Sequence, residues 1–100
     1  MDAPYELGES TQAVKDLKEL RARAIERGMK REFLAALLTI AEKLQHDPIA
    51  WGDPEYELIK EGGRMFHVAC NPLYIQYAVY ELEKAVFLIR VTPMSSSGLE

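Results

Sequence analysis

Hydrophobic residues recur at helical spacing through the first half of the chain and predict two helices. The first begins at Ser10–Thr11, because these residue types cap helix N-termini, and Gly28 is typical of a helix end. The second begins near Lys30 and ends at Asp47–Pro48, because a residue before proline avoids the helical conformation. The connection between them is short, so an antiparallel hairpin is expected.

The second half of the chain changes to the alternating pattern of β-strands. Strands are predicted over 64–70, 73–81 and 85–91, with turns at Asn71–Pro72 and over 81–84. The middle strand alternates, with Leu73, Ile75, Tyr77 and Val79 on one face and Tyr74, Gln76, Ala78 and Tyr80 on the other. The three strands are expected to pair as an antiparallel meander.

The remaining segments are predicted to be connections or ends. Residues 48–57 contain two prolines and a glycine and are expected to form a loop, which Trp51 anchors onto the core. A short first strand can form at 4–7. Residues 1–94 are predicted to be a single domain, and residues 95–100 a flexible C-terminal tail.

These elements predict an α+β fold with an N-terminal helical hairpin packed on a three- to four-stranded antiparallel sheet. The helices cover one face of the sheet and leave the other partly open to solvent. The periodicity places thirteen residues in the core: Val14, Leu17, Phe33, Leu37, Ile40, Leu44, Phe66, Val68, Ile75, Tyr77, Val79, Phe87 and Ile89.

Composition narrows the class of protein. Hydrophobic residues make up 48% of the 100-residue chain and charged residues 28%, as in a soluble globular domain. Cys70 is the only cysteine, which excludes an internal disulfide and a multi-cysteine metal site. No secretory signal and no membrane-spanning run is recognisable, so we expect a cytoplasmic protein without membrane contact, metal or cofactor. The net charge of −4 is unlike that of a typical nucleic-acid binder, which is basic.

Candidate chemistry gathers on the predicted open face of the sheet. Tyr74, Gln76 and Tyr80 lie there, and meander pairing brings His67 and Arg90 to the same side. Such a set can bind and cut RNA, with arginine on phosphate, tyrosine stacked on bases and histidine transferring protons. The alternative is a solvated sheet face with ordinary cross-strand pairs.

Several short motifs resemble those of the RelE/ParE toxin superfamily of bacterial toxin–antitoxin systems. The helical hairpin opens with Ser-Thr-Gln-Ala-Val from Ser10, and the second helix ends in His-Asp-Pro before Gly52. Three strands follow that resemble the three-strand core of the family, and the likeness covers about residues 4–94. The resemblance implies a toxin, of the kind associated with plasmid stabilisation, that a protein antitoxin neutralises.

Two activities are known in that superfamily, cleavage of mRNA on the ribosome and inhibition of gyrase. For cleavage, the resemblance leaves Lys60, Arg64, His67 and Arg90 as site residues: Arg64 and Arg90 on the scissile phosphate, His67 as acid or base, and Lys60 toward substrate. Tyr74 stands where the family has arginine, and residues 92–98 lack its late tyrosine and basic residues. These departures favour the gyrase-inhibiting branch or a fold relative without activity, and a non-enzymatic protein-interaction module stays open.

Overall fold

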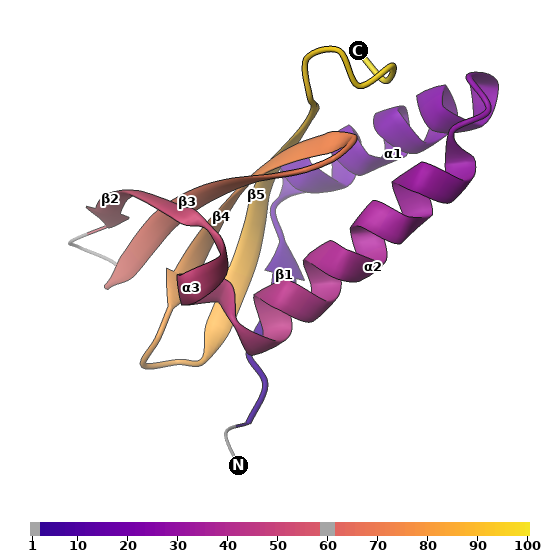
Figure 1. Ribbon diagram of the computed structural model, residues 1–100. Coiled ribbons are helices and arrows are strands. Elements are labelled where there is room, and N and C mark those ends of the chain that lie inside the picture. The colour runs from indigo at the N-terminus through magenta and orange to yellow at the C-terminus, as the bar shows by residue number, and fades with distance from the viewer. Residues whose placement is uncertain (1–2, 59–61) are drawn as a thin grey trace.

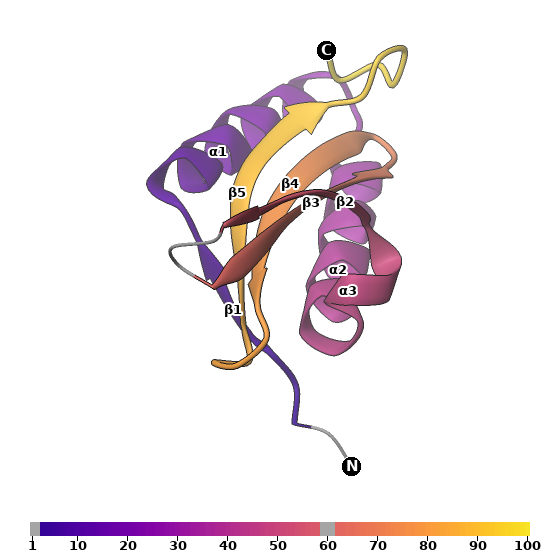
Figure 2. The same ribbon diagram turned by 90° about the vertical axis from the view of Figure 1, so that its left-hand side faces the viewer.

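The computed structural model describes residues 3–58 and 62–100 and places both long helices on one side of a five-stranded sheet (Figure 1). The elements follow in the order β1 (Glu6–Glu9), α1 (Thr11–Glu26), α2 (Lys30–His46), α3 (Pro48–Trp51), β2 (Asp53–Leu58), β3 (Gly63–Cys70), β4 (Leu73–Tyr80) and β5 (Ala85–Pro93). Figure 2 shows α1 and α2 on the far side of the strands. The predicted α+β class and helical hairpin are confirmed.

The sheet differs from the prediction in size and direction. Its strand order is β1-β5-β4-β3-β2, so it has five strands where three or four were expected. The first strand runs over Glu6–Glu9, later than the predicted 4–7, and pairs in parallel with β5. The sheet is therefore mixed: after the hairpin the chain enters the sheet at the edge opposite β1, with β2, and returns strand by strand to β5, which lies beside β1. The other neighbouring strands are antiparallel.

The helix ends follow the predicted local chemistry. Ser10 caps α1 by accepting a hydrogen bond from the Ala13 N–H at 2.9 Å, and its hydroxyl donates to the Ile89 carbonyl at 2.7 Å. Gly28 has a positive φ of 72°, and the Met29 N–H donates to the Ala24 carbonyl at 2.7 Å. This pattern satisfies the last carbonyls of the helix with a left-handed residue. The hairpin is therefore fixed at both ends of α1.

The predicted loop over residues 48–57 is wrong, because α3 and β2 fill it. Trp51 does anchor this segment: its ring stacks on Tyr77 with centroids 6.3 Å apart, and Tyr77 stacks on Phe66 at 5.4 Å. The Tyr77 hydroxyl donates to the Pro48 carbonyl at 2.6 Å. Gly52 is required at this point, since a Cβ there would lie 2.2 Å from that hydroxyl oxygen.

Seven of the thirteen predicted core residues are buried, four are partly buried, and two are exposed. Val14 is 37% exposed and Phe87 is 42% exposed. On α1 the buried stripe passes instead through Ala13 and Leu20. On β5 the buried residues are Val86, Leu88 and Val91. The sequence did not predict them because this strand is apolar on both faces and does not show which face is covered.

A bulge in β5 sets the geometry of the open face. Tyr77 pairs with Leu88, but Gln76 pairs with Arg90, so Ile89 is an extra residue with no partner of its own. An extra residue reverses the alternation that follows it. Phe87 and Arg90 therefore share the open face although they are three residues apart.

The C-terminal residues turn back onto α1. Leu99 is buried, and the Arg23 and Arg27 side chains donate to the carbonyls of Leu99 and Gly98 at 3.0 and 2.9 Å. The flexibility expected for residues 95–100 stays a prediction, and these contacts are the ones that such motion would break. Across the described residues, none of the helices has the length and apolar character needed to traverse a lipid bilayer.

Candidate functional site on the open sheet face

A row of polar residues crosses four strands on the face opposite the helices. Asp53 of β2 pairs with His67 of β3, His67 pairs with Gln76 of β4, and Gln76 pairs with Arg90 of β5. Residues paired directly across neighbouring strands point to the same side of a sheet. The predicted placement of His67, Gln76 and Arg90 on one face therefore agrees with the register.

Glu55 completes this row, although the sequence prediction did not include it. The pairing of β2 with β3 is irregular between Pro54 and Tyr56, and Glu55 lies at that irregularity. One Glu55 oxygen, Oε1, lies 2.9 Å from His67 Nδ1, and the other, Oε2, accepts a hydrogen bond from Gln76 Nε2 at 2.9 Å. The Glu55 carboxylate is thus held by two neighbours on two different strands.

The contact with Glu55 orients the His67 ring. For Nδ1 to donate to the Glu55 carboxylate it must carry the proton, which leaves Nε2 of the neutral ring as the acceptor. Asp53 Oδ2 lies 3.9 Å from that Nε2. A carboxylate on Nδ1 orients an imidazole and stabilises its charged form when Nε2 takes a proton. In this tautomer Nε2 is the ring nitrogen that can accept a proton.

Aromatic rings lie beside the polar row on the same face. Tyr74, which is 41% exposed, stacks on the His67 ring with centroids 5.8 Å apart and planes inclined by 23°. Farther along the face, Tyr80 and Phe87 meet edge to face at 5.8 Å. Exposed aromatic rings can stack on the bases of a single-stranded nucleic acid. Tyr74 is the exposed aromatic ring next to His67.

Arg90 belongs to this row, but an acidic side chain on α1 holds its guanidinium. Its Nε donates to Asp16 Oδ2 of α1 at 3.0 Å, and the Val91 N–H donates to the same oxygen at 2.9 Å. Burial raises the pKa of Asp16, but hydrogen bonds from Val91, Gln12 and Arg90 outweigh it and bring the pKa below its ordinary value. The Asp16 carboxylate therefore stays charged and fixes the arginine through Nε.

Arg64 is separated from the other predicted catalytic residues. It pairs with buried Val79, so it lies on the helix face of the sheet while His67 lies on the open face. Its guanidinium is 3.6 Å from a Glu81 oxygen and 5.5 Å from the centre of the Phe66 ring. The three residues predicted to act together, Arg64, His67 and Arg90, are not brought together. Lys60 lies outside the described residues.

The acidic groups around His67 do not form a metal site. Glu55 contacts Nδ1 and Asp53 faces Nε2, so the two carboxylates lie at opposite edges of the ring and do not converge on one point. Within residues 3–58 and 62–100, no group of three or more histidine, cysteine or acidic side chains is placed to hold a metal ion.

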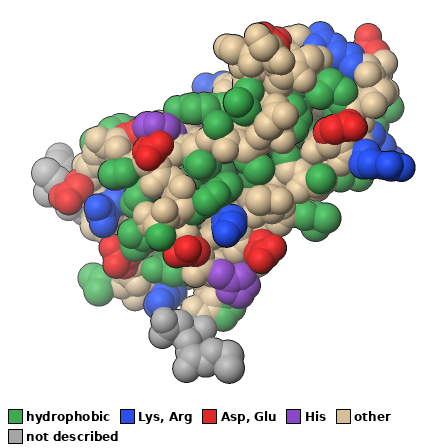
Figure 3. All heavy atoms as spheres, in the orientation of Figure 1, with side chains coloured by type: hydrophobic (Ala, Val, Ile, Leu, Met, Phe, Trp, Pro, Cys, Tyr) green, Lys and Arg blue, Asp and Glu red, His purple; other side chains and the backbone are tan. Residues whose placement is uncertain are grey.

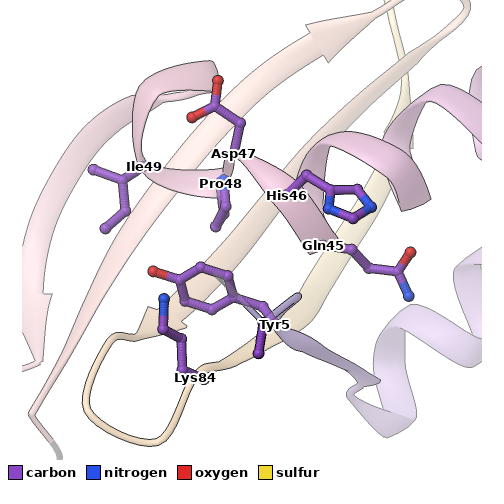
Figure 4. Close-up of a pocket in the computed structure, with 8 residues that line it drawn as sticks. Tyr5, Gln45, His46, Asp47, Pro48, Ile49 and Lys84 are labelled. Atoms are coloured by element: carbon purple, nitrogen blue, oxygen red, sulfur yellow. The ribbon is translucent and has the colours of Figure 1, made fainter. Parts of the chain in front are cut away.

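A separate cavity of about 170 Å³ lies where α2 ends, near Tyr5 and Lys84 (Figure 4). The Lys84 ammonium lies 4.7 Å from the centre of the Tyr5 ring. Figure 4 shows the Asp47 carboxyl group pointing away from Lys84. Among the described residues, no side-chain hydrogen bond links the ionisable groups of this cavity, whereas those of the open face contact one another. The open face is therefore the stronger candidate site.

The fold is shared with two solved complexes, while the sequence matches no protein-family profile and no curated protein. A chain of the toxin–antitoxin complex RelBE2 from Mycobacterium tuberculosis aligns with a TM-score of 0.66 and 23% identity. The alignment covers 91% of this chain and 99% of that one. A chain of the archaeal RelE–RelB complex from Pyrococcus horikoshii aligns with a TM-score of 0.63 and 16% identity, covering 92% and 97%. This chain therefore has a RelE-like fold.

Proposed function

We propose that this chain is the toxin component of a toxin–antitoxin pair, acts in the cytoplasm and is neutralised by a protein antitoxin. The observation that carries the proposal is the extent of the fold match. The likeness runs over nearly the whole of both chains, so it concerns the complete domain and not a common substructure. Both of the similar structures are described as toxin–antitoxin complexes.

Induced expression in a bacterial host tests this role. Growth is expected to stop after induction and to resume when the cognate antitoxin gene is expressed beside it. Continued growth with abundant folded protein would contradict a toxin role and favour the non-enzymatic interaction module.

As the action of this toxin we propose cleavage of RNA on the open sheet face. The specific observation that favours it is the His67 ring held by Glu55, with Gln76 on the second carboxylate oxygen. In this mechanism Nε2 of His67 removes the proton from a ribose 2′-hydroxyl, and Glu55 stabilises the resulting imidazolium. The 2′-oxygen attacks the adjacent phosphorus, a cyclic phosphate forms, and the 5′-oxygen of the next nucleotide leaves and takes a proton from water.

The other residues of the face have supporting roles in this mechanism. The guanidinium of Arg90 binds the phosphate and stabilises negative charge that develops on it. Tyr74 stacks on a base next to His67, and Gln76 keeps the Glu55 carboxylate in position. Tyr80 lies on the same face at the end of β4, where its ring contacts Phe87.

Purified protein tests the cleavage step directly. It is expected to cut RNA in the presence of a chelator, and His67→Ala is expected to lower the rate by roughly 100-fold or more. Arg64→Gln is the control, because Arg64 lies on the other face and its loss is expected to leave most of the activity. Growth arrest without cleavage of free or ribosome-bound RNA would point to gyrase instead.

A further inference from the structure

An apolar stripe on α2 faces solvent, on the side of that helix opposite the core. Leu34 is 41% exposed and Leu38 is 73% exposed, and together with Ala35 they line a shallow apolar groove next to Lys30 and Arg31. The buried residues of the same helix, among them Phe33 and Ile40, point the other way. Large apolar side chains placed together on a helix surface are typical of an interaction site.

Charges lie at both ends of this stripe and have opposite signs. Lys30 and Arg31 stand at its N-terminal end, and Glu42 lies one turn beyond Leu38 on the same side. The four ion pairs among the described residues involve none of these three side chains. In Figure 3 hydrophobic side chains interrupt the polar surface along α2, and basic side chains gather at one end of the helix.

The pattern is self-complementary about its midpoint. Arg31 and Glu42 are equally far from a point between residues 36 and 37, and so are Ala35 and Leu38. A second α2 that packs antiparallel across this point, through a two-fold axis, sets each Arg31 against Glu42 of the second copy. It also seats each Leu38 over the small Ala35 of the second copy, in the manner of a knob entering a hole.

We propose that the α2 stripe, Arg31, Leu34, Ala35, Leu38 and Glu42, binds a second copy of this chain as a symmetric dimer. An acidic partner helix would match Lys30 and Arg31 but would be repelled by Glu42, whereas a second copy sets Arg31 against Glu42 at both ends of the stripe. The stripe lies on the helix side of the molecule, so dimerisation leaves both open sheet faces free. A contact limited to one face of α2 is a small interface, and small interfaces form weak dimers.

Sedimentation equilibrium of the full chain, over concentrations that extend into the millimolar range, measures the association. The wild type is expected to pass from monomer to dimer, and Leu38→Lys to weaken the dimer at least about tenfold. Leu82→Lys is the matched control: Leu82 is 94% exposed in the β4–β5 turn, and its substitution is expected to leave the dimer unchanged.

A charge exchange separates this dimer from any other apolar contact. Arg31→Glu and Glu42→Arg alone are each expected to weaken the dimer about fivefold, because each places like charges together at two symmetric positions. The double variant is expected to restore it. Both changes put charge where the helix dipole favours it, so α2 is expected to stay folded, which circular dichroism checks. A wild type that stays monomeric, a dimer insensitive to Leu38→Lys, or a double variant no stronger than the single ones would each overturn the proposal.

Discussion

The sheet carries one key carboxylate on each side, and the two have different surroundings. Asp16, on the helix side, is only 7% exposed and accepts hydrogen bonds from Gln12, Arg90 and the Val91 N–H. Glu55, on the open side, holds His67 and Gln76 while its side chain stays 22% exposed. A carboxylate enclosed by donors fastens elements together, whereas one that is open to solvent and paired with histidine is available for chemistry.

Removing each carboxylate in turn is expected to show the largest difference in stability between the two sides of the sheet. Asp16→Ala leaves the buried Val91 N–H without a partner and removes hydrogen bonds to a charged group, so the free energy of unfolding falls by about 3 kcal/mol. Glu55→Ala is expected to change it by less than about 1 kcal/mol, because exposed pairs contribute little. Urea denaturation measures both, and equal losses would contradict the division between the two sides.

High pH is expected to lower the free energy of unfolding through Tyr77, which lies on the helix side of the sheet. Burial, together with the charges of Asp53 and Asp47 and against the opposing hydrogen bond from Gly52, raises the pKa of Tyr77 to about 12. Between pH 10 and 12 the unfolded chain therefore loses this proton before the folded chain does. Stability falls as the pH rises through that window, by up to roughly 3 kcal/mol. Denaturation of wild type and Tyr77→Phe checks this, since the variant lacks this part of the slope.

The tyrosines of the two sides give a smaller contrast at neutral pH. Tyr77→Phe removes the buried hydrogen bond to the Pro48 carbonyl and is expected to lower the free energy of unfolding by about 1 to 2 kcal/mol. Tyr74→Phe keeps the ring that stacks on His67 and is expected to be close to neutral. If thermal melting shows the larger loss for Tyr74→Phe, the open face contributes more to stability than its exposure indicates.

Local signals explain how much of the fold the sequence predicted. Capping at Ser10, the glycine at position 28 and the proline after Asp47 are interactions between near neighbours, so both ends of the hairpin could be predicted. The alternation of β4 assigned its two faces correctly, since one face is clearly more polar. In β5 both faces are apolar, and the bulge at Ile89 depends on pairing with a distant strand. The parity of that strand was therefore mispredicted.

The site was predicted only in part, because some of its contacts also depend on pairing between distant strands. His67, Gln76 and Arg90 share the open face as the register requires, but Arg64 was included through resemblance and lies on the other face. Glu55 and Asp53 were missed because Gly52 and Pro54 indicated a loop. A signal was present: Pro54, Tyr56 and Leu58 alternate with three acidic residues, which is the period of a strand. The contact of Glu55 with Gln76 joins residues 21 positions apart and leaves no local pattern.

The effect of Glu55→Gln on bacterial growth tests most directly whether the open face carries the toxic action. The substitution keeps the shape of the side chain but removes the charge that, in the proposed mechanism, stabilises the His67 imidazolium. Glu57→Gln is the matched control, because Glu57 lies on the same strand and pairs with Arg64 on the opposite face. At equal levels of folded protein, wild type and Glu57→Gln are expected to stop growth, while cells that express Glu55→Gln continue to grow. Growth arrest by Glu55→Gln equal to that of the wild type would contradict the assignment of toxicity to this face.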